Sequence, residues 1–220
     1  MIGTLLTSEA DRPEKYWARP ASVHYGDSEI DLLYSLVGQI LSQWEEVELA
    51  LVNLFSVMSE ADTPASSMAV NRTYGAIGFN SGRRQAVSFV AELYFGRQFW
   101  RKAKADLNLL LKHIEYASSR RDDVAHGRVT SVTVNGVYHG CFLVAPEYNT
   151  RFSYPYMGDV KDDPISFLRS RYRYTGNDLM ILLQKLSQLR LQVHHYLSFV
   201  YKDKGRFGPS FVEKYAPSLK

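Results

Sequence analysis

Residues 29–58 read EIDLLYSLVGQILSQWEEVELALVNLFSVM, and this stretch decides the fold. Its apolar residues recur at alternating steps of three and four, which places them on one face of a helix. This apolar stripe consists of Ile30, Leu33, Val37, Ile40, Trp44, Val47, Leu51, Leu54 and Met58. Other leucines and valines lie off the stripe, so we expect more than one face of the helix to contact protein. The pattern predicts a long amphipathic helix over residues 29–58.

The same spacing recurs in two later parts of the chain. It predicts a helix over 97–125, whose stripe of Trp100, Ala103, Leu107, Leu110, Ile114 and Ala117 continues to Arg121. It also predicts a last helix over 176–201, which the capping pair Thr175 and Asp178 begins. Shorter helices are expected at 64–76, after Thr63, and at 82–95. Three long and two shorter helices favour an antiparallel bundle.

Between the last two helices the period changes from helical to alternating. Residues 129–145 alternate on both sides of Asn135 and Gly136, a pair typical of tight turns, and therefore predict a β-hairpin. Residues 171–174 suit a third short strand, and 202–220 form a basic tail. The predicted fold is mainly α: a bundle of four to five antiparallel helices, with a hairpin or three short strands inserted before the last helix. We expect residues 1–220 to form a single domain.

Composition limits the function only weakly. A chain of 220 residues with 45% hydrophobic content can bury one sizeable core. The net charge of +3 is compatible with nucleic acid but does not identify a partner. No apolar run approaches the roughly 20 residues that span a bilayer, so we expect no membrane partner and a cytoplasmic protein. The single cysteine, Cys141, fits a reducing compartment and has no neighbours at zinc-ligand spacing, so no metal or other cofactor is expected.

One short motif carries most of the functional information. Residues 121–127 read RDDVAHG and end the second of the three long predicted helices, 97–125, with a glycine. Arginine followed by four residues and histidine also occurs at Arg19 to His24 and at Arg190 to His195. The first of these lies in an irregular segment and the second lies in the middle of a helix, so both are interpreted as accidental. Only at Arg121 does a polar residue follow the arginine and a helix stop follow the histidine.

In that context RDDVAHG resembles the RxxxxH signature of the HEPN superfamily, the higher eukaryotes and prokaryotes nucleotide-binding domains. The resemblance implies an up-and-down helical bundle that forms a homodimer with its motifs facing. It also implies a metal-independent ribonuclease in a toxin–antitoxin, phage-defence or RNA-processing system, which cleaves single-stranded RNA. Arg121 and His126 would then be catalytic, and an antitoxin or another protein partner is expected. The alternative is a HEPN-like module without catalysis that binds a nucleotide, RNA or a protein partner.

The chemistry of these side chains fits that interpretation. Histidine exchanges protons near neutral pH, and arginine stabilises charge on a phosphate. Asp122 and His126, four residues apart, share a helix face, so we expect the Asp122 carboxylate to orient the imidazole. Arg120 and Arg128 are expected to contact substrate phosphates.

Three other interpretations remain open at this stage. Cations at a helix C-terminus can act as caps without any catalytic role. Asp123 and His126 match half of a carboxylate-bridged metal motif, to which Glu45, Glu46 and Glu48 could add oxygens. The Tyr- and Arg-rich segment 148–174 suits either stacking on single-stranded bases or packing of the hairpin against the bundle, and packing is favoured.

Overall fold

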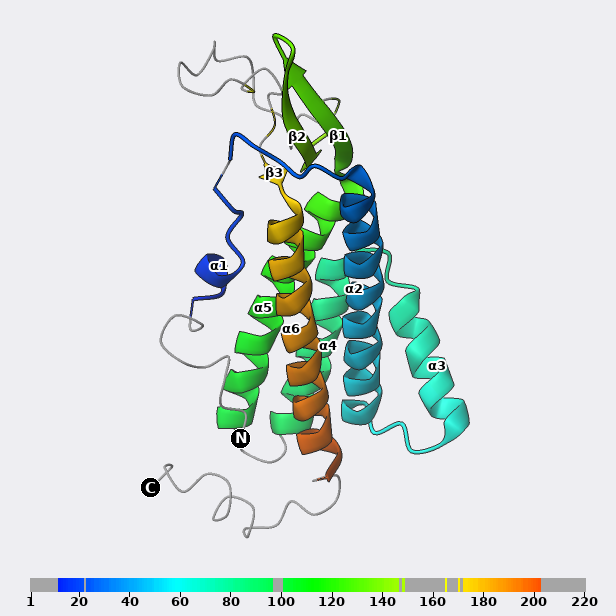
Figure 1. Cartoon of the computed structure of the whole chain (residues 1–220). Helices are drawn as coiled ribbons and strands as arrows, with labels where there is room; N and C mark the ends of the chain where they lie inside the picture. The colour runs from blue at the N-terminus through cyan, green and yellow to red at the C-terminus, as the bar shows by residue number, and fades with distance from the viewer. Residues whose placement is uncertain are drawn as a thin grey trace. The chain divides into compact units, whose positions relative to one another are not determined.

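The computed structural model describes residues 12–21, 23–96, 101–146, 148, 165, 170 and 172–202. In this part of the chain there are six helices and three strands (Figure 1). The helices are α1 (Pro13–Tyr16), α2 (Ile30–Met58), α3 (Pro64–Gly75), α4 (Asn80–Gly96), α5 (Arg101–His126) and α6 (Gly176–Lys202). The strands are β1 (Arg128–Val134), β2 (Val137–Val144) and β3 (Arg173–Tyr174).

The predicted fold class is confirmed: the chain is mainly helical, and a small antiparallel sheet precedes the last helix. Most element bounds differ from the predicted ones by one or two residues. The largest differences for a predicted element are that α4 begins at Asn80, inside the expected turn, and that the described part of α5 begins at Arg101. Helix α1 was not predicted, because four residues are too few for a periodic pattern. Residues 97–100 and 203–220 lie outside the described part of the chain.

By their internal contacts the residues divide into two compact units. The first contains the described residues between 47 and 115 and between 189 and 202. The second contains those between 12 and 46 and between 116 and 188, and therefore holds the sheet and the RDDVAHG motif. In the described part of the chain, no helix is both long and apolar enough to cross a membrane.

In the first unit, aromatic and aliphatic side chains form the core and polar side chains tie the helices together. The hydroxyl of Tyr196 in α6 donates to the carbonyl of Ala103 in α5, at 2.8 Å. Glu48 in α2 accepts hydrogen bonds from Tyr74 at 3.2 Å and from Arg83 at 3.1 Å. These contacts satisfy a carboxylate that would otherwise be costly to bury.

The sheet of the second unit is built around the predicted hairpin. Strands β1 and β2 pair antiparallel from Arg128 opposite Val144 to Val134 opposite Val137. Asn135 and Gly136 both have positive φ, 50° and 79°, as the two central residues of a tight hairpin turn require. The short β3 pairs with the other edge of β2, so the strand order is β1-β2-β3. The third strand suggested by residues 171–174 is thus confirmed over its last two residues.

The segment before α2 also pairs with β2. Asp27 and Cys141 exchange two backbone hydrogen bonds, of 3.0 and 2.7 Å. Next to them Gly26 and Gly140 pack backbone against backbone: a Cβ atom on Gly26 would lie 2.2 Å from the Cys141 carbonyl oxygen. Only glycine fits this close approach.

The start of α6 is fixed from two directions. Thr175 and Asp178 form the predicted capping box, in which the Thr175 amide donates to Asp178 at 2.9 Å and the Asp178 amide donates to Thr175 at 3.3 Å. The Gly176 amide donates to the Asp27 carboxylate at 2.6 Å. The negative carboxylates at this end complement the helix dipole.

The segment that contains α1 is held to α6 and α5. The Tyr16 hydroxyl donates to Gln188 at 2.9 Å, and Lys185 donates to the Tyr16 carbonyl at 2.6 Å. Trp17 is buried, and Arg19 two residues later reaches α5. This N-terminal segment therefore brings an arginine to the end of the helix that carries the motif.

Candidate functional site

Arg121 lies where the apolar stripes of α2 and α5 meet, as its place on the stripe predicts. Its guanidinium carbon is 5.9 Å from the centre of the Trp44 ring, close enough for a cation–π contact. Its Nη1 donates to Asp122 Oδ1 at 3.1 Å, and its Nη2 lies 3.9 Å from Glu45 Oε1. About a quarter of the side chain, 26%, is exposed. The guanidinium is thus held on an aromatic ring, and the side chain as a whole is partly exposed.

His126 is the last residue of α5, and its side chain is exposed. Within the described residues no hydrogen bond or ion pair joins it to Arg121 or Asp122. The spacing of four residues favours a contact of Asp122 with His126. In the structure Asp122 contacts Arg121 instead. The structure therefore brings Arg121 and Asp122 together and leaves the imidazole of His126 accessible at the helix end.

Gly127 ends α5 where β2 crosses the end of the helix. A Cβ atom at this position would lie 2.8 Å from the Asp123 carbonyl oxygen and 2.8 Å from a methyl carbon of Leu143. The glycine of the motif is therefore required by packing. It sets the point at which the chain leaves the helix after His126.

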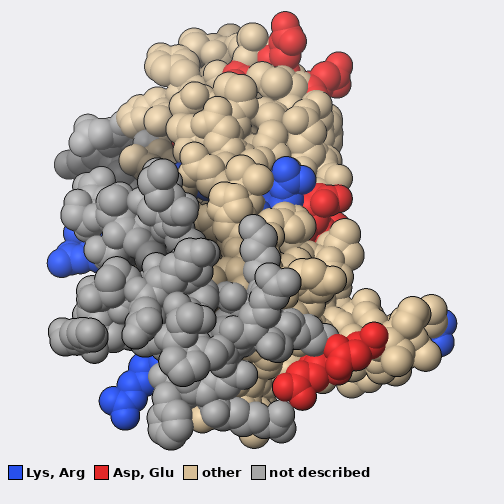
Figure 2. All heavy atoms as spheres, turned by 90° about the horizontal axis from the view of Figure 1, so that it is seen from below, with Lys and Arg blue, Asp and Glu red and all other residues tan. Residues whose placement is uncertain are grey.

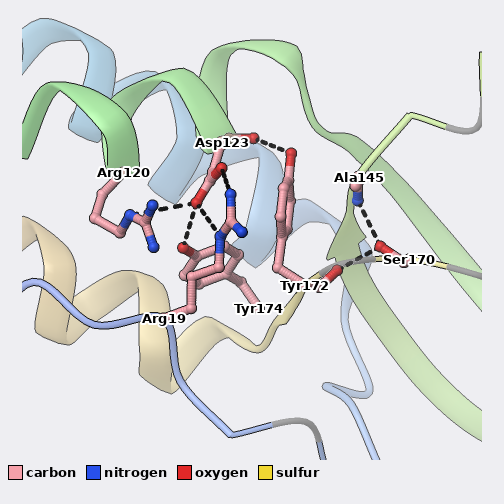
Figure 3. A network of polar contacts seen from close by, with 7 residues as sticks. All are labelled: Arg19, Arg120, Asp123, Ala145, Ser170, Tyr172 and Tyr174. Atoms are coloured by element: carbon pink, nitrogen blue, oxygen red, sulfur yellow. Dashed lines mark hydrogen bonds and ion pairs between the residues drawn. The ribbon is translucent and has the colours of Figure 1, made fainter. Parts of the chain in front are cut away.

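Asp123 is the buried centre of a polar network at this end of the helix (Figure 3). Arg19 binds its carboxylate with two hydrogen bonds, from Nε to Oδ2 at 2.9 Å and from Nη2 to Oδ1 at 2.6 Å. These hydrogen bonds raise the pKa of the Arg19 guanidinium. Arg120 adds an ion pair from its Nε to Oδ2 at 3.3 Å. A buried carboxylate is tolerated in this position because it is paired and hydrogen-bonded.

Two tyrosines from the end of the Tyr- and Arg-rich segment complete the network. The Tyr174 hydroxyl donates to Asp123 Oδ2 at 2.9 Å, and the Tyr172 hydroxyl donates to the Asp123 backbone carbonyl at 2.7 Å. That carbonyl is one of the last four of α5, which have no partner within the helix. Burial raises the pKa of both phenols, and the charge of Asp123 raises it further. Both tyrosines are therefore neutral donors at neutral pH.

Ser170 holds the chain in place before these tyrosines. Its hydroxyl accepts a hydrogen bond from the Ala145 amide at 2.8 Å and donates to the Tyr172 carbonyl at 2.5 Å. Tyr172, Arg173 and Tyr174 are all buried, as the packing interpretation of this segment favours. Tyr148 is exposed, and the other Tyr and Arg residues of 148–171 lie outside the described residues.

The remaining predicted residues have different surroundings. Arg128 is exposed at the start of β1. Glu45 and Glu46 are exposed, whereas Glu48 is buried and engaged by Arg83 and Tyr74. Over the residues described, no three His, Cys, Asp or Glu side chains lie together as metal ligands would. The half-motif of Asp123 and His126 is not a metal site here, since the Asp123 carboxylate is occupied by Arg19 and Tyr174.

Charged groups do not gather into a continuous basic surface on the face drawn in Figure 2. The described Lys and Arg side chains of that face stand apart from one another. This distribution agrees with the small net charge of +3. On this face the described cations therefore form no continuous track for a polyanion.

Sequence reasoning missed Arg19 and the structural role of Asp123. Arg19 was interpreted as part of an accidental repeat of the motif spacing, yet it makes the shortest ion pair of this network. No local pattern connects the two residues, because 104 positions separate them. Comparison with family models, with curated proteins and with solved structures finds no match for this chain.

Proposed function

We propose that the chain is a metal-independent endoribonuclease of the HEPN type, which acts as a homodimer in the cytoplasm. Its context would be a toxin–antitoxin, phage-defence or RNA-processing system, with single-stranded RNA as substrate. The observation that carries the proposal is the end of α5, where a partly exposed arginine packed on Trp44 precedes an exposed histidine. A positioned cation and a group that titrates near neutral pH are what phosphodiester cleavage requires.

In the proposed reaction the ribose 2'-oxygen attacks the adjacent phosphorus, and the bond from phosphorus to the 5'-oxygen breaks. His126 takes the proton of the 2'-hydroxyl as general base, or gives one to the departing 5'-oxygen as general acid. Arg121 stabilises the negative charge that develops on the phosphoryl oxygens. The products are a 2',3'-cyclic phosphate and a 5'-hydroxyl. Asp122 supports Arg121 through the contact of 3.1 Å, and Arg120 and Arg128 contact neighbouring phosphates.

The geometry of one helix supports the proposed homodimer. Residues five apart on an α-helix are rotated by about 140°, so Arg121 and His126 of one subunit point in different directions. Two helix ends that face each other would place an arginine of one subunit beside a histidine of the other.

The second candidate is a HEPN-like module without catalysis, which binds a nucleotide, RNA or a protein partner. The contact of Asp122 with Arg121 favours it, because the imidazole then lacks the carboxylate that would orient it. In this case the arginines at the end of α5 would hold phosphate groups without turnover.

Product chemistry separates the two candidates. Purified protein is incubated with single-stranded RNA in the presence of a chelator, and the RNA ends are identified. The ribonuclease yields 2',3'-cyclic phosphates, and Arg121→Ala and His126→Ala abolish them. If the wild-type protein leaves the RNA intact, or if the variants give the same products, the enzyme proposal fails and the binding module stands.

A further inference from the structure

The network around Asp123 contains more positive than negative charge. Arg19 and Arg120 both bind this one carboxylate, and their Nε atoms lie 2.9 and 3.3 Å from the same oxygen, Oδ2. Tyr172 and Tyr174 are neutral, since burial raises the pKa of both. Two guanidiniums against one carboxylate leave one positive charge in excess.

Within the described part of the chain, much of the hydrogen-bonding capacity of these two guanidiniums is not used. A guanidinium has five N–H donors, and Arg19 spends two of them on Asp123. The Nε of Arg120 makes an ion pair without the geometry of a hydrogen bond. Among the residues that the structure describes, Arg120 has no other polar partner. Three N–H groups of Arg19 and the two terminal amino groups of Arg120 therefore have no hydrogen-bond partner among the described residues.

Both arginine side chains are partly exposed. The Arg19 side chain is 29% exposed and that of Arg120 is 15% exposed, whereas the Asp123 side chain is 1% exposed. The network thus fixes both guanidiniums against the buried Asp123 carboxylate, while part of each arginine side chain stays exposed. Their rotamers are already ordered, so a ligand would lose less free energy in immobilising them.

Nearby negative groups that would repel an anion are largely satisfied. The Asp123 carboxylate is covered by Arg19 and Tyr174, and its backbone carbonyl accepts from Tyr172. Asp122, the adjacent acidic residue, contacts Arg121. The excess charge at Arg19 and Arg120 therefore lacks a partner of opposite sign among the described side chains.

We propose that Arg19 and Arg120 together form a phosphate-binding site, with the Asp123 network as its rigid support. A phosphate group has several acceptor oxygens and can bind two guanidinium forks at once. The phosphate is that of an RNA backbone or of a small phosphate compound. The phosphate site itself does not depend on the proposed function. Only the assignment of the bound phosphate to an RNA backbone rests on that function. Arg120 and Arg121 are consecutive, so a strand held here would pass the end of α5.

The first test uses inorganic phosphate and the full chain. The melting temperature is measured in increasing potassium phosphate, against potassium chloride of equal ionic strength. A ligand that binds only the folded state raises the melting temperature, because it stabilises that state by RT ln(1 + [L]/Kd). We expect phosphate to raise it above the chloride control, and Arg120→Gln to weaken phosphate binding about tenfold or more.

Arg84 in α4 provides a matched control. It has nearly the same exposure as Arg120, 16%, and one ion pair, of 3.8 Å to Glu115. Arg84→Gln should leave the effect of phosphate unchanged. If Arg120→Gln does not fold, Arg120→Lys keeps the charge but loses the fork, and it should weaken binding as well. Equal effects of phosphate and chloride on the wild-type protein, or equal phosphate binding by wild type and the folded Arg120 variant, would overturn the proposal.

A second arm identifies the source of the phosphate. A 2'-O-methyl oligoribonucleotide with a 5'-hydroxyl end has only internal phosphodiesters and cannot be cleaved through its 2'-oxygen. Weaker binding of this oligomer by Arg120→Gln would assign the site to the RNA backbone. Phosphate binding with no effect of Arg120→Gln on the oligomer would assign it to small phosphate compounds. Neither result depends on turnover, so a failure here and a failure to find cyclic-phosphate products are distinguishable.

Discussion

Arg19 and Asp123 are joined by two hydrogen bonds, of 2.9 and 2.6 Å, although 104 residues separate them in the chain. This contact ties the N-terminal segment to the last turns of α5, one turn before His126. The proposed cleavage residues and the proposed phosphate-binding pair therefore share one support. We therefore expect substitutions in the Asp123 network to lower the free energy of unfolding more than substitutions of exposed side chains nearby.

Asp123→Asn removes the negative charge that both guanidiniums bind. We expect the free energy of unfolding to fall by about 2–4 kcal/mol, because the partners of a buried ion pair lose their counter-charge. Asp122→Asn is the control: this neighbouring side chain is 38% exposed, and its loss should cost at most about 1 kcal/mol. Urea unfolding of both variants measures the difference. Equal values for the two would show that the Asp123 network contributes little to stability.

Tyr174 makes stability depend on alkaline pH. Burial raises its pKa above the unfolded value of 10.0, so above that pH the unfolded state loses a proton that the folded state keeps. Stability should therefore fall as pH rises through and above 10, by up to about 1.4 kcal/mol per pH unit for this group. In Tyr174→Phe the fall between pH 9.5 and 11 should be shallower than in the wild type. Parallel curves in urea unfolding would contradict this role of the phenol.

Gly26 and Gly38 are expected to respond in opposite directions to the same substitution. Gly26→Ala places a Cβ atom 2.2 Å from the Cys141 carbonyl oxygen, so we expect a loss of about 1–3 kcal/mol. Around Gly38 in α2 a Cβ atom would meet nothing within 4 Å, and alanine should stabilise the helix by about 0.5–1 kcal/mol. Thermal unfolding of the two variants tests the comparison. A tolerated Gly26→Ala would mean that the contact with β2 can shift.

The proposed dimer can be tested by mixing two inactive variants. A mixed dimer of Arg121→Ala and His126→Ala keeps one intact pair if each site takes its arginine and histidine from different subunits. With random pairing of equal amounts, about half of the dimers are mixed, and each mixed dimer has one intact site of two. The mixture should then show about a quarter of the wild-type activity on RNA. Subunits are exchanged by joint refolding before the assay. No activity in the mixture would mean that each subunit uses its own pair.

The long elements of the fold could be predicted because their signals are local. Regular apolar stripes fix α2, α5 and α6, and Asn135 and Gly136 favour the positive φ angles of the hairpin turn. Helix α1 could not be predicted, since what holds it is contact with residues such as Gln188, 172 positions away from Tyr16. The Asp27 carboxylate at the start of α6 is another long-range contact that no local pattern indicates.

The candidate site was predictable only in part for the same reason. Arg121 continues the apolar stripe of α5, and it lies against Trp44 on the apolar stripe of α2. Asp123 points away from that stripe, where an acidic residue is expected to be solvated. Its burial depends on Arg19 and Tyr174, which come from distant parts of the chain. Helical spacing describes one face of one helix and carries no information about what covers another face.

The most direct test of the central claim compares two exposed histidines in the same assay. His126 and His195 both follow an arginine by five positions, but His195 lies in the middle of α6. Cleavage of single-stranded RNA is measured as kcat/KM for the wild type, His126→Ala and His195→Ala, in a chelator. The account predicts a loss of about a hundredfold or more for His126→Ala and no change for His195→Ala. Equal rates for the two variants would contradict it.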